Sequence, residues 1–248
     1  MDIVVCVRRV RDGAEPGRSA IGPLERHALE EALRLKERFG GRVTALAMGS
    51  PPAGRALEEA LAAGADRAVF LCDARFAGAD TLATARTLYY GIRRLGPFDL
   101  VLCGNESATG ATGQVGPQLA EFLGVPCVTH VRRLEAPAPD RLLAERALEH
   151  GHMRVEVWLP ALVAVVKGIN TPRLPTVWGI MAAAEKGITV WNAEDLGLDP
   201  HLVGLEGSPT RLVRERKTEF GRRREIFAGP PEEAVRKAVA RLKELGVL

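Results

Sequence analysis

Hydrophobic positions in the first half of the chain follow two alternating patterns. Short unbroken apolar runs are typical of strands buried on both faces of a parallel sheet. Between these runs, apolar residues recur every three or four positions, as they do along one face of a helix. The patterns predict strands over residues 3–7, 43–48, 68–72 and 100–103, with helices that start at Pro23, after the N-caps Ser50 and Asp80, and near Gln114. Because right-handed crossovers join such units, this order predicts an open, doubly wound, mostly parallel sheet of the Rossmann-like α/β class.

The pattern changes after Pro126. An antiparallel meander that extends the sheet is predicted from three segments separated by turn sequences, at residues 128–134, 142–148 and 153–159. Residues 162–166 predict one further buried strand, and Thr176 can cap a short helix that ends near Lys186. We therefore interpret residues 1–204 as one α/β domain.

The composition shifts again from Leu205 onward. Residues 211–224 carry seven basic side chains and only two acidic ones, with few apolar residues among them. A final amphipathic helix follows, with Pro231 in its first turn and an apolar stripe that ends at Leu245. We interpret residues 205–248 as an arm that leaves the main domain and docks by its helix. A nucleic-acid-binding arm is disfavoured because no aromatic residues alternate with the basic ones.

Composition and charge exclude several classes of protein. The chain has 248 residues, of which 46% are hydrophobic and 26% charged, as expected of a globular domain that needs no disulfide or metal for its core. A net charge of +3 does not indicate a nucleic-acid partner. The start of the chain does not resemble a secretory signal, and the longest apolar run, residues 159–166, is far shorter than a membrane span of roughly 20 residues. These features favour a cytoplasmic protein without membrane insertion.

Cysteines and histidines offer little evidence of a metal site. The four cysteines form no C-x-x-C pair and lie in or beside apolar runs, which predicts buried, reduced thiols at Cys6, Cys72, Cys103 and Cys127. His150 and His152 flank a turn without a nearby group of carboxylates, so we expect solvated side chains there. On the first helix, Glu30, Glu31, Arg34 and Glu37 have the spacing of a solvated i,i+4 network.

The glycine-rich segment at residues 104–116 is the strongest functional signal. In an open α/β sheet, ligands bind beyond the carboxyl ends of the strands, and this segment follows the fourth one. Its glycines let the backbone approach a ligand, Thr109 and Thr112 offer hydroxyls, and the helix near Gln114 offers free N–H groups. A phosphate cradle and an ordinary loop before a helix both fit this pattern. With no acid–base pair or activated nucleophile in view, the sequence predicts a nucleotide holder without its own catalytic group.

Several segments, taken in order, match one family. The matching blocks are residues 7–12 (V-R-R-V-R-D), 28–37, 60–68, 112–117, 159–163, 170–173 and 179–181. Over residues 3 to about 201, the sequence resembles the beta (small) subunit of electron transfer flavoproteins. The resemblance implies a heterodimer with a larger alpha subunit that carries most of the FAD site, while the beta subunit closes over one side of the flavin. It also implies an AMP without a redox role, and electrons that pass from acyl-CoA-type dehydrogenases to a membrane quinone reductase.

The resemblance also assigns site residues. The AMP contacts that it implies are Cys6, Gly22, Pro23, Leu24, Glu25, Met48, Thr109, Gly110, Ala111, Thr112, Gly113, Gln114, Val115, Gly116 and Ala120. These include the glycine-rich segment. The chain departs from the family at Thr109 and Ala111, where acids are common, at Gly22 in place of Asn, at Gly13 in place of an aromatic residue, and at Thr171 in place of an acid.

Two further sets of residues are candidates for contacts with partners. Residues 179–201 resemble the family's recognition segment for dehydrogenases, which implies partner binding by Ile180, Met181, Asp195 and Leu196. Because Leu196 lies between acids and a glycine, we expect its side chain to face solvent. Arg8, Arg9 and Arg11 follow the first strand and are candidates for stabilising reduced flavin or for pairing across the subunit interface.

Two alternatives remain open at this point. A bifurcating relative would hold a second FAD where AMP would bind, and the altered loop at Thr109–Ala111 motivates this alternative. A stand-alone ATP-binding α/β protein, or an adenylating enzyme, would share the predicted fold. The glycine spacing after Asn105 does not resemble the phosphate loop of stress-type proteins, and no S-G-G-x-D-S run is present.

Overall fold

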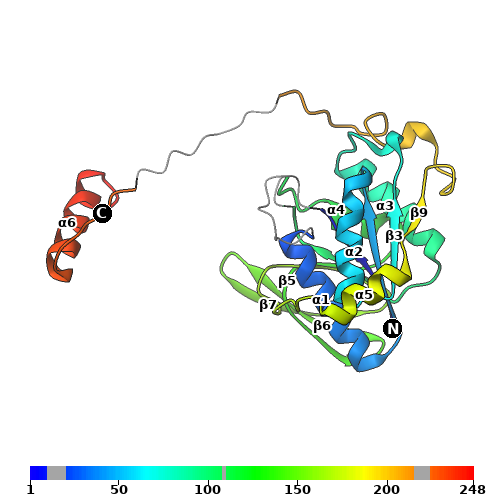
Figure 1. Cartoon of the computed structure of the whole chain (residues 1–248), viewed down its shortest axis with the longest axis horizontal. Helices are drawn as coiled ribbons and strands as arrows, with labels where there is room; N and C mark the ends of the chain where they lie inside the picture. Colours follow the sequence, from blue (N-terminus) through cyan, green and yellow to red (C-terminus); the bar gives the residue numbers. More distant parts are fainter. Residues whose placement is uncertain (10–20, 108–109, 215–223) are drawn as a thin grey trace. The chain divides into compact units, whose positions relative to one another are not determined.

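The computed structural model describes residues 1–9, 21–107, 110–214 and 224–248. These residues form two compact units, Met1–Arg211 and Leu212–Leu248. The first unit is built on a nine-stranded sheet in the order β7-β6-β5-β8-β4-β1-β2-β3-β9 (Figure 1). Its elements are β1 (Asp2–Cys6), α1 (Pro23–Phe39), β2 (Arg42–Met48), α2 (Gly54–Ala63), β3 (Arg67–Leu71), α3 (Thr81–Leu95), β4 (Leu100–Gly104), α4 (Val115–Leu123), β5 (Cys127–Ala138), β6 (Arg141–Leu148), β7 (Gly151–Trp158), β8 (Ala161–Val165), α5 (Val177–Lys186) and β9 (Thr189–Trp191), with 3₁₀ turns η1 (Pro51–Ala53), η2 (Ala74–Phe76) and η3 (Pro200–Leu202).

The sheet is parallel except at one end. Strands β5, β8, β4, β1, β2, β3 and β9 run parallel, whereas β6 and β7 add an antiparallel ribbon to β5. This confirms the predicted doubly wound sheet and its antiparallel extension. The strand order reverses between β1 and β4, because the chain first moves outward through β2 and β3 and then returns to the other side of β1. Strand β9 is absent from the prediction, since only Trp191 of its residues is buried.

Helices cover both faces of the sheet. Figure 1 shows α1, α2 and α5 on one face and α3 and α4 behind the other. Alternate residues of β1 follow this division: Ile3 and Val5 belong to the hydrophobic cluster of α1 and α2, whereas Val4 and Cys6 belong to that of α3 and α4. Successive side chains of a central strand therefore alternate between the two faces, and both faces are buried. This explains the unbroken apolar runs.

The helix starts show which predicted caps operate. The Asp80 carboxylate accepts from the N–H groups of Leu82 and Ala83, and the Thr176 hydroxyl accepts from Gly179, as predicted. Ser50 makes no side-chain cap: the two residues that follow it are prolines without N–H groups, and the next N–H, of Ala53, donates to the Ser50 carbonyl oxygen. It precedes the 3₁₀ turn η1, and α2 begins only at Gly54.

The cysteines are only partly buried. Cys6 and Cys103 are buried, and burial raises the pKa of the Cys6 thiol to about 12. Cys72 is half-buried, and Cys127 is exposed because it begins β5 directly after the turn at Pro126. The expectation that all four thiols are buried is therefore wrong for these two. No group of three or more potential metal ligands occurs among the described residues.

The boundary between the units lies later than residue 204. The Leu205 N–H donates to the carbonyl oxygen of Ala77, and Thr210 donates through both its N–H and its hydroxyl to the Asp80 carboxylate. These bonds hold residues 205–210 on the first unit. The same aspartate therefore caps α3 and anchors the start of the arm.

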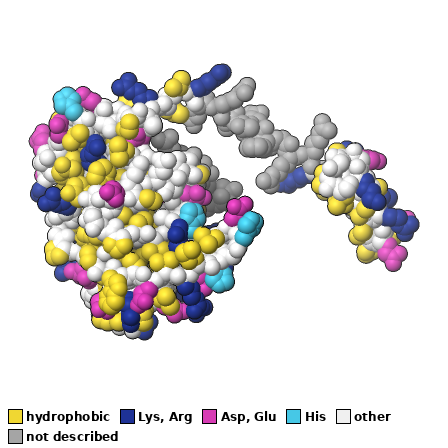
Figure 2. Space-filling view, turned by 180° about the vertical axis from the view of Figure 1, so that it is seen from behind, with side chains coloured by type: hydrophobic (Ala, Val, Ile, Leu, Met, Phe, Trp, Pro, Cys, Tyr) yellow, Lys and Arg dark blue, Asp and Glu magenta, His cyan; other side chains and the backbone are white. Residues whose placement is uncertain are grey.

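The second unit contains α6 (Pro231–Glu244), which buries none of its residues. Its apolar stripe is exposed, with Val235 at 62% and Leu242 at 38%. Figure 2 shows hydrophobic side chains on the surface of this helix. Arg241 forms a two-pronged ion pair with Glu225, which ties the helix to the segment before it. In the described parts of the chain, no helix is long and apolar enough to cross a membrane.

Candidate functional site

The reversal of strand order brings the predicted site residues to one edge of the sheet. Cys6 ends β1, Met48 ends β2 and Gly104 ends β4, so the loops that follow them share the carboxyl edge. The first turn of α1 lies against the end of β4, because a Cβ added at Gly104 would be 2.8 Å from the Cβ of Leu24. Residues 22–25 and the glycine-rich loop therefore meet where the sheet reverses, which is where ligands of such folds bind.

The glycine-rich loop presents backbone N–H groups. Ala111 and Gly113 have left-handed φ values of 47° and 63°. Ser107 fixes the preceding turn, since its carbonyl oxygen accepts from the Ala111 N–H at 2.9 Å and its hydroxyl from the Gly110 N–H at 3.1 Å. Among the described residues, no acceptor bonds to the N–H groups of Gly113, Val115 or Gly116. Turns of this kind at a helix N-terminus bind anions. Thr109 lies outside the described residues.

Neighbouring elements fix the start of α4. The side-chain oxygen of Gln114 accepts a hydrogen bond from the Thr81 hydroxyl, at the start of α3. Gly116 lies against β4, where an added Cβ would be 3.3 Å from Cys103 Sγ. Gly116 therefore serves the close packing of α4 on the sheet, while Gly113 has the backbone conformation that favours glycine.

Glu25 is a buried acid in the first turn of α1. It is 9% exposed, and burial raises the pKa of its carboxyl while the positive charge of Arg8 works in the opposite direction. A Cβ at Gly22 would lie 2.0 Å from Glu25 Oε2. The glycine that stands in place of the family's Asn therefore leaves room for the Glu25 carboxylate in its present position. Arg8 and Arg9 follow β1, and Arg11 and Gly13 lie outside the described residues.

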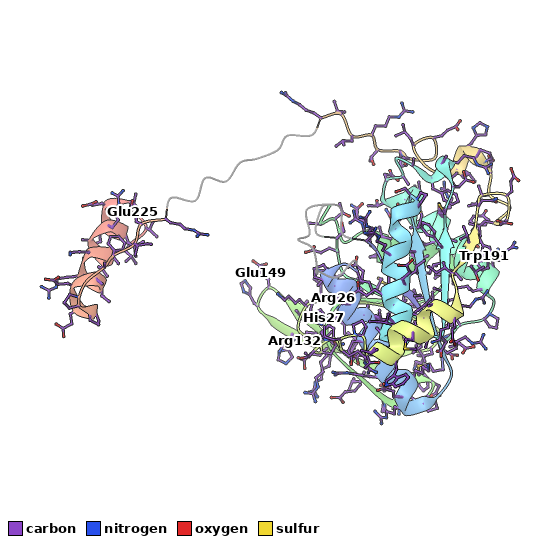
Figure 3. The ribbon with its side chains drawn as sticks, in the orientation of Figure 1. Arg26, His27, Arg132, Glu149, Trp191 and Glu225 are labelled. Atoms are coloured by element: carbon purple, nitrogen blue, oxygen red, sulfur yellow. The ribbon has the colours of Figure 1, made fainter. Side chains whose placement is uncertain are left out.

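The acidic face of α1 is not a solvated network. Glu30 and Glu31 are 4% and 7% exposed. Arg173 Nε donates to Glu30 at 2.8 Å, and Asn170 Nδ2 donates at 2.9 Å both to Glu31 and to the carbonyl oxygen of His27, which is labelled on α1 in Figure 3. One i,i+4 pair of the predicted network is present, since Arg34 Nε donates to Glu30 at 2.8 Å, but the expectation that these two glutamates are solvated is wrong. Their other partners lie about 140 positions along the chain, so helical spacing gave no signal for those contacts.

The charges of this network are strongly paired. Burial alone would raise the pKa of Glu30, but hydrogen bonds from Arg173 and Arg34 hold it below its usual range. Burial raises the pKa of Glu31, which receives only the neutral Asn170 amide and a more distant charge from Arg34. The network fixes residues 170–173 on α1, directly before α5. Thr171, which replaces the family's acid, contributes its backbone carbonyl oxygen, which accepts from Arg34 Nη2 at 3.5 Å.

Sequence reasoning also missed the contact between Asn105 and His130. Asn105 is 6% exposed and follows β4 directly, at the start of the glycine-rich loop. Its Oδ1 accepts from the His130 N–H at 2.9 Å, and its Nδ2 lies 3.2 Å from His130 Nε2. His130 lies in β5, and only the pairing of β5 with β8 brings the two residues together.

The recognition-like segment differs from the sequence expectation at Leu196. This side chain is 8% exposed and packs in the hydrophobic cluster that includes Leu198 and Trp191, the latter labelled in Figure 3. The Trp191 carbonyl oxygen accepts from Cys72 N–H, and Ala193 N–H donates to the Asp73 carboxylate, so the segment is drawn against β3. The expectation that Leu196 faces solvent is therefore wrong. Asp195 is half-buried, and its carboxylate accepts from the N–H of Asn192.

The exposed apolar residues of this region lie around α5. We call them the α5 patch: Leu174, Val177, Trp178, Ile180 and Met181, which are 57–81% exposed. The opposite side of α5 approaches α2 so closely that a Cβ at Gly179 would be 2.2 Å from the Ala62 carbonyl oxygen. Ile180 and Met181, both predicted to bind a partner, are thus available for contact, whereas Leu196 is not.

Comparison with known proteins decides the family. Residues 14–196 match the electron transfer flavoprotein domain. The chain belongs to the electron transfer flavoprotein family. It is 44% identical over 240 residues to the electron transfer flavoprotein subunit beta of Thermoanaerobacterium thermosaccharolyticum, covering 96% of this chain and 90% of that one. It is 42% identical over 257 residues to the subunit of the same name from Clostridium acetobutylicum, covering 98% of each.

A third relative belongs to a larger complex. The chain is 38% identical, over the full length of both proteins, to subunit CarD of the caffeyl-CoA reductase-Etf complex of Acetobacterium woodii. The resemblance noted from the sequence motifs is confirmed, and this electron transfer flavoprotein is of the beta-subunit type. A stand-alone ATP-binding protein or adenylating enzyme is set aside.

The raised pKa of Glu31 leads to a prediction about pH. Because burial raises this pKa above 4.5, the folded state binds the proton more tightly than the unfolded chain does, so ionisation of Glu31 lowers the free energy of unfolding as pH rises above that value. We expect Glu31→Gln to gain stability relative to wild type between about pH 4.5 and about pH 8, as measured by urea unfolding. Glu121→Gln, on the exposed side of α4, is the control. A stability difference that does not change with pH would contradict the prediction.

The burial of Leu196 leads to a second prediction. Replacing a buried leucine by alanine removes packing contacts and leaves a cavity, so Leu196→Ala should lower the free energy of unfolding by about 3 kcal/mol. Trp178→Ala, on the exposed α5 patch, should change it by less than about 0.5 kcal/mol. Denaturant unfolding of both variants measures the difference. An unchanged stability for Leu196→Ala would show that its side chain is exposed after all.

Proposed function

We propose that this subunit pairs with an alpha subunit, binds AMP at the carboxyl edge between β1 and β4, and closes over one side of an FAD held mainly by its partner. Electrons would then pass from an acyl-CoA-type dehydrogenase to a membrane quinone reductase. The observation that carries the nucleotide site is the set of N–H groups at Gly113, Val115 and Gly116, which have no acceptor among the described residues. They lie where the strand order reverses.

The residues at this edge fit an adenylate. The N–H groups at the start of α4 suit a phosphate, and the positive end of the helix dipole adds to the attraction. Cys6, Leu24 and Met48 offer apolar surface for the adenine, and Glu25 offers an acceptor for a ribose hydroxyl. Burial raises the pKa of the Glu25 carboxyl, a shift that favours its neutral form. In this proposal Thr112, Gln114 and Ala120 complete the wall of the site.

The part played by this chain in electron transfer is positional. FAD supplies the redox chemistry when it is bound. Arg8 and Arg9, at the carboxyl end of β1, are proposed to place positive charge beside the flavin or to pair with the alpha subunit. The rest of the chain excludes water and presents docking surfaces.

Two docking surfaces belong to the proposal. The α5 patch offers Trp178 and its neighbours to the dehydrogenase, since large exposed apolar side chains within a polar surround are typical anchors of interfaces. Asp195, whose carbonyl oxygen accepts from Arg94 of α3, is proposed as a separate contact. Residues 212–248, with the exposed stripe of α6, are proposed to dock on the alpha subunit, because an amphipathic helix without a buried face needs a partner to cover it.

The second candidate function is the bifurcating type with a second FAD in place of AMP. The departure from the family's loop at Ala111 motivates it, and two relatives bear on its electron acceptor: besides CarD of the caffeyl-CoA reductase-Etf complex, the acryloyl-CoA reductase electron transfer subunit gamma of Anaerotignum propionicum is 38% identical over 237 residues. Both proteins are named for complexes with CoA-ester reductases. In such a complex this chain would deliver electrons to a reductase instead of receiving them from a dehydrogenase.

The nucleotide content of the purified heterodimer tests the proposal. We expect denaturation to release one FAD and one AMP per heterodimer, quantified by chromatography. Gly113→Ala should lower the AMP content and leave the FAD content unchanged, because a side chain strains the left-handed backbone at the cradle. Gly40→Ala is the control, since Gly40 also has a positive φ but ends α1 away from the cradle. Two FAD and no AMP would favour the bifurcating type.

Electron-transfer kinetics test the α5 patch. Losing one central interface anchor costs at least about 2 kcal/mol, or roughly thirtyfold in affinity. We expect Trp178→Ala to slow electron transfer with the CoA-ester enzyme by at least tenfold at limiting concentration, with no change in FAD content. Trp158→Ala is the matched control, because Trp158 is 60% exposed on β7. Equal rates for the two variants would place the docking surface elsewhere.

A further inference from the structure

Strand β5 contains a bulge beside the glycine-rich loop. Val128 pairs with Val163 of β8, and the next pair is Val131 with Val165, so β5 has one more residue than β8 in this interval. His130 takes up the extra length with a left-handed φ of 57°. Its N–H thereby leaves the ladder of β8 and needs another acceptor.

Asn105 supplies that acceptor. Its own N–H donates to the Val165 carbonyl oxygen at 2.9 Å, which fixes its backbone at the end of β8. Its Oδ1 accepts from the His130 N–H at 2.9 Å, so the side-chain amide has one allowed orientation. Its Nδ2 must then be the atom that faces His130 Nε2, at 3.2 Å.

This arrangement selects one protonation state of the imidazole. Because Nδ2 can only donate, Nε2 has to accept and carries no proton. The proton then resides on Nδ1, which lies 3.3 Å from Thr129 Oγ1. Arg146 of β6 also bonds to Thr129, through both the carbonyl oxygen and the hydroxyl, and so holds this acceptor in place.

We propose that His130 is a positioning residue for the nucleotide loop: as a neutral, Nδ1-protonated imidazole it holds Asn105, and protonation of Nε2 releases Asn105 and weakens nucleotide binding in acid. This inference rests on the nucleotide site proposed above. Few residues separate Asn105 from the nucleotide loop. Asn105 is two residues from Ser107, which accepts hydrogen bonds from the N–H groups of Gly110 and Ala111. A shift of Asn105 therefore moves the turn that presents the N–H of Gly113.

The charged groups around His130 do not compete for this role. They are Glu106 beside Asn105, Arg146 on β6, Lys167 after β8, and Arg132 on β5, which is labelled in Figure 3 and pairs with Glu145 at 3.3 Å. Histidine is the side-chain type among these that changes charge between about pH 5 and pH 8. Glu25, at the same edge, has a carboxyl whose pKa is raised by burial, and it is present both in wild type and in His130→Asn, so the comparison of these two proteins isolates the imidazole.

Two matched variants separate the imidazole from the bulge. His130→Asn keeps a residue that tolerates the left-handed backbone and keeps the N–H that Asn105 Oδ1 accepts, but it removes the imidazole. Asn105→Asp keeps that acceptor and replaces the Nδ2 donor by a second acceptor. An aspartate bonds to a protonated Nε2, so this variant should favour the protonated imidazole that wild type excludes.

The first test is the affinity of the purified heterodimer for AMP, measured by calorimetry after the bound nucleotide has been removed. Because the AMP phosphate itself titrates near pH 6, the pH profile of wild type is compared with that of His130→Asn. We expect wild type to lose about tenfold more affinity than His130→Asn between about pH 8 and about pH 5.5, a difference of about 1.4 kcal/mol. Asn105→Asp should lose less affinity in acid than His130→Asn. Coincident profiles for wild type and His130→Asn would overturn the inference.

The second test needs no nucleotide. In a heterodimer whose histidines are ¹⁵N-labelled in this subunit alone, the signal of His130 is the one of five that is missing from His130→Asn. At about pH 8 we expect its Nδ1 to be protonated and its Nε2 unprotonated; the opposite tautomer would overturn the inference. If AMP fails to bind wild type at every pH, the proposed nucleotide site is wrong, and so is the proposed link between His130 and that site. If the protein binds AMP but His130 has the opposite tautomer, only the proposed role of His130 is wrong.

Discussion

The parallel pairing of β1 with β4 is the constraint on which the rest of the structure depends. In register, Ile3 pairs with Leu100 and Cys6 with Cys103, so both strands end at the same level. After β1 the chain crosses toward β2, and after β4 it crosses toward β8 and β5, so the loops that follow these two strands meet at one edge, where ligands of such folds bind. The first turns of α1 and α4 both lie at this edge, and the closeness of Gly104 to Leu24 leaves no room for a side chain at that junction. The strand order and its connections therefore set the position of the candidate nucleotide site, and the side chains then set its chemistry.

A second level of organisation comes from polar contacts between distant segments. Arg173 and Asn170 bind buried glutamates of α1, and Asp73 holds the backbone of Ala193. Buried carboxylates are costly unless they are paired, so each of these contacts fixes one position of its segment. As a result, α5 and the residues up to Leu198 form a fixed part of the first unit. Helix α1 contacts the candidate nucleotide site at its start and residues 170–173, directly before α5, along its length.

The structure moves the candidate docking surface within the segment that the sequence had indicated. Leu196 belongs to the core, whereas Trp178 and Met181 are exposed on α5. A mostly apolar helix surface in a family of electron carriers suits a partner that must bind, exchange electrons and leave, since a few central anchors give specificity in a small interface. The relatives named for CoA-ester reductase complexes show that the same fold serves within larger assemblies.

The sequence alone determined the central sheet, its antiparallel extension and the caps at Asp80 and Thr176, and it indicated the glycine-rich loop as a candidate phosphate site. Each of these depends on neighbouring residues: side-chain alternation, helical spacing and the lack of Cβ atoms are local properties. The tertiary structure decided what depends on distant pairs. It buried Glu30 and Glu31 under Arg173 and Asn170, drew Leu196 into the core through β9, left Cys127 exposed at a strand end and placed His130 against Asn105. No local pattern encodes these contacts, because burial and hydrogen bonding at those positions arise only when segments far apart in the sequence come together.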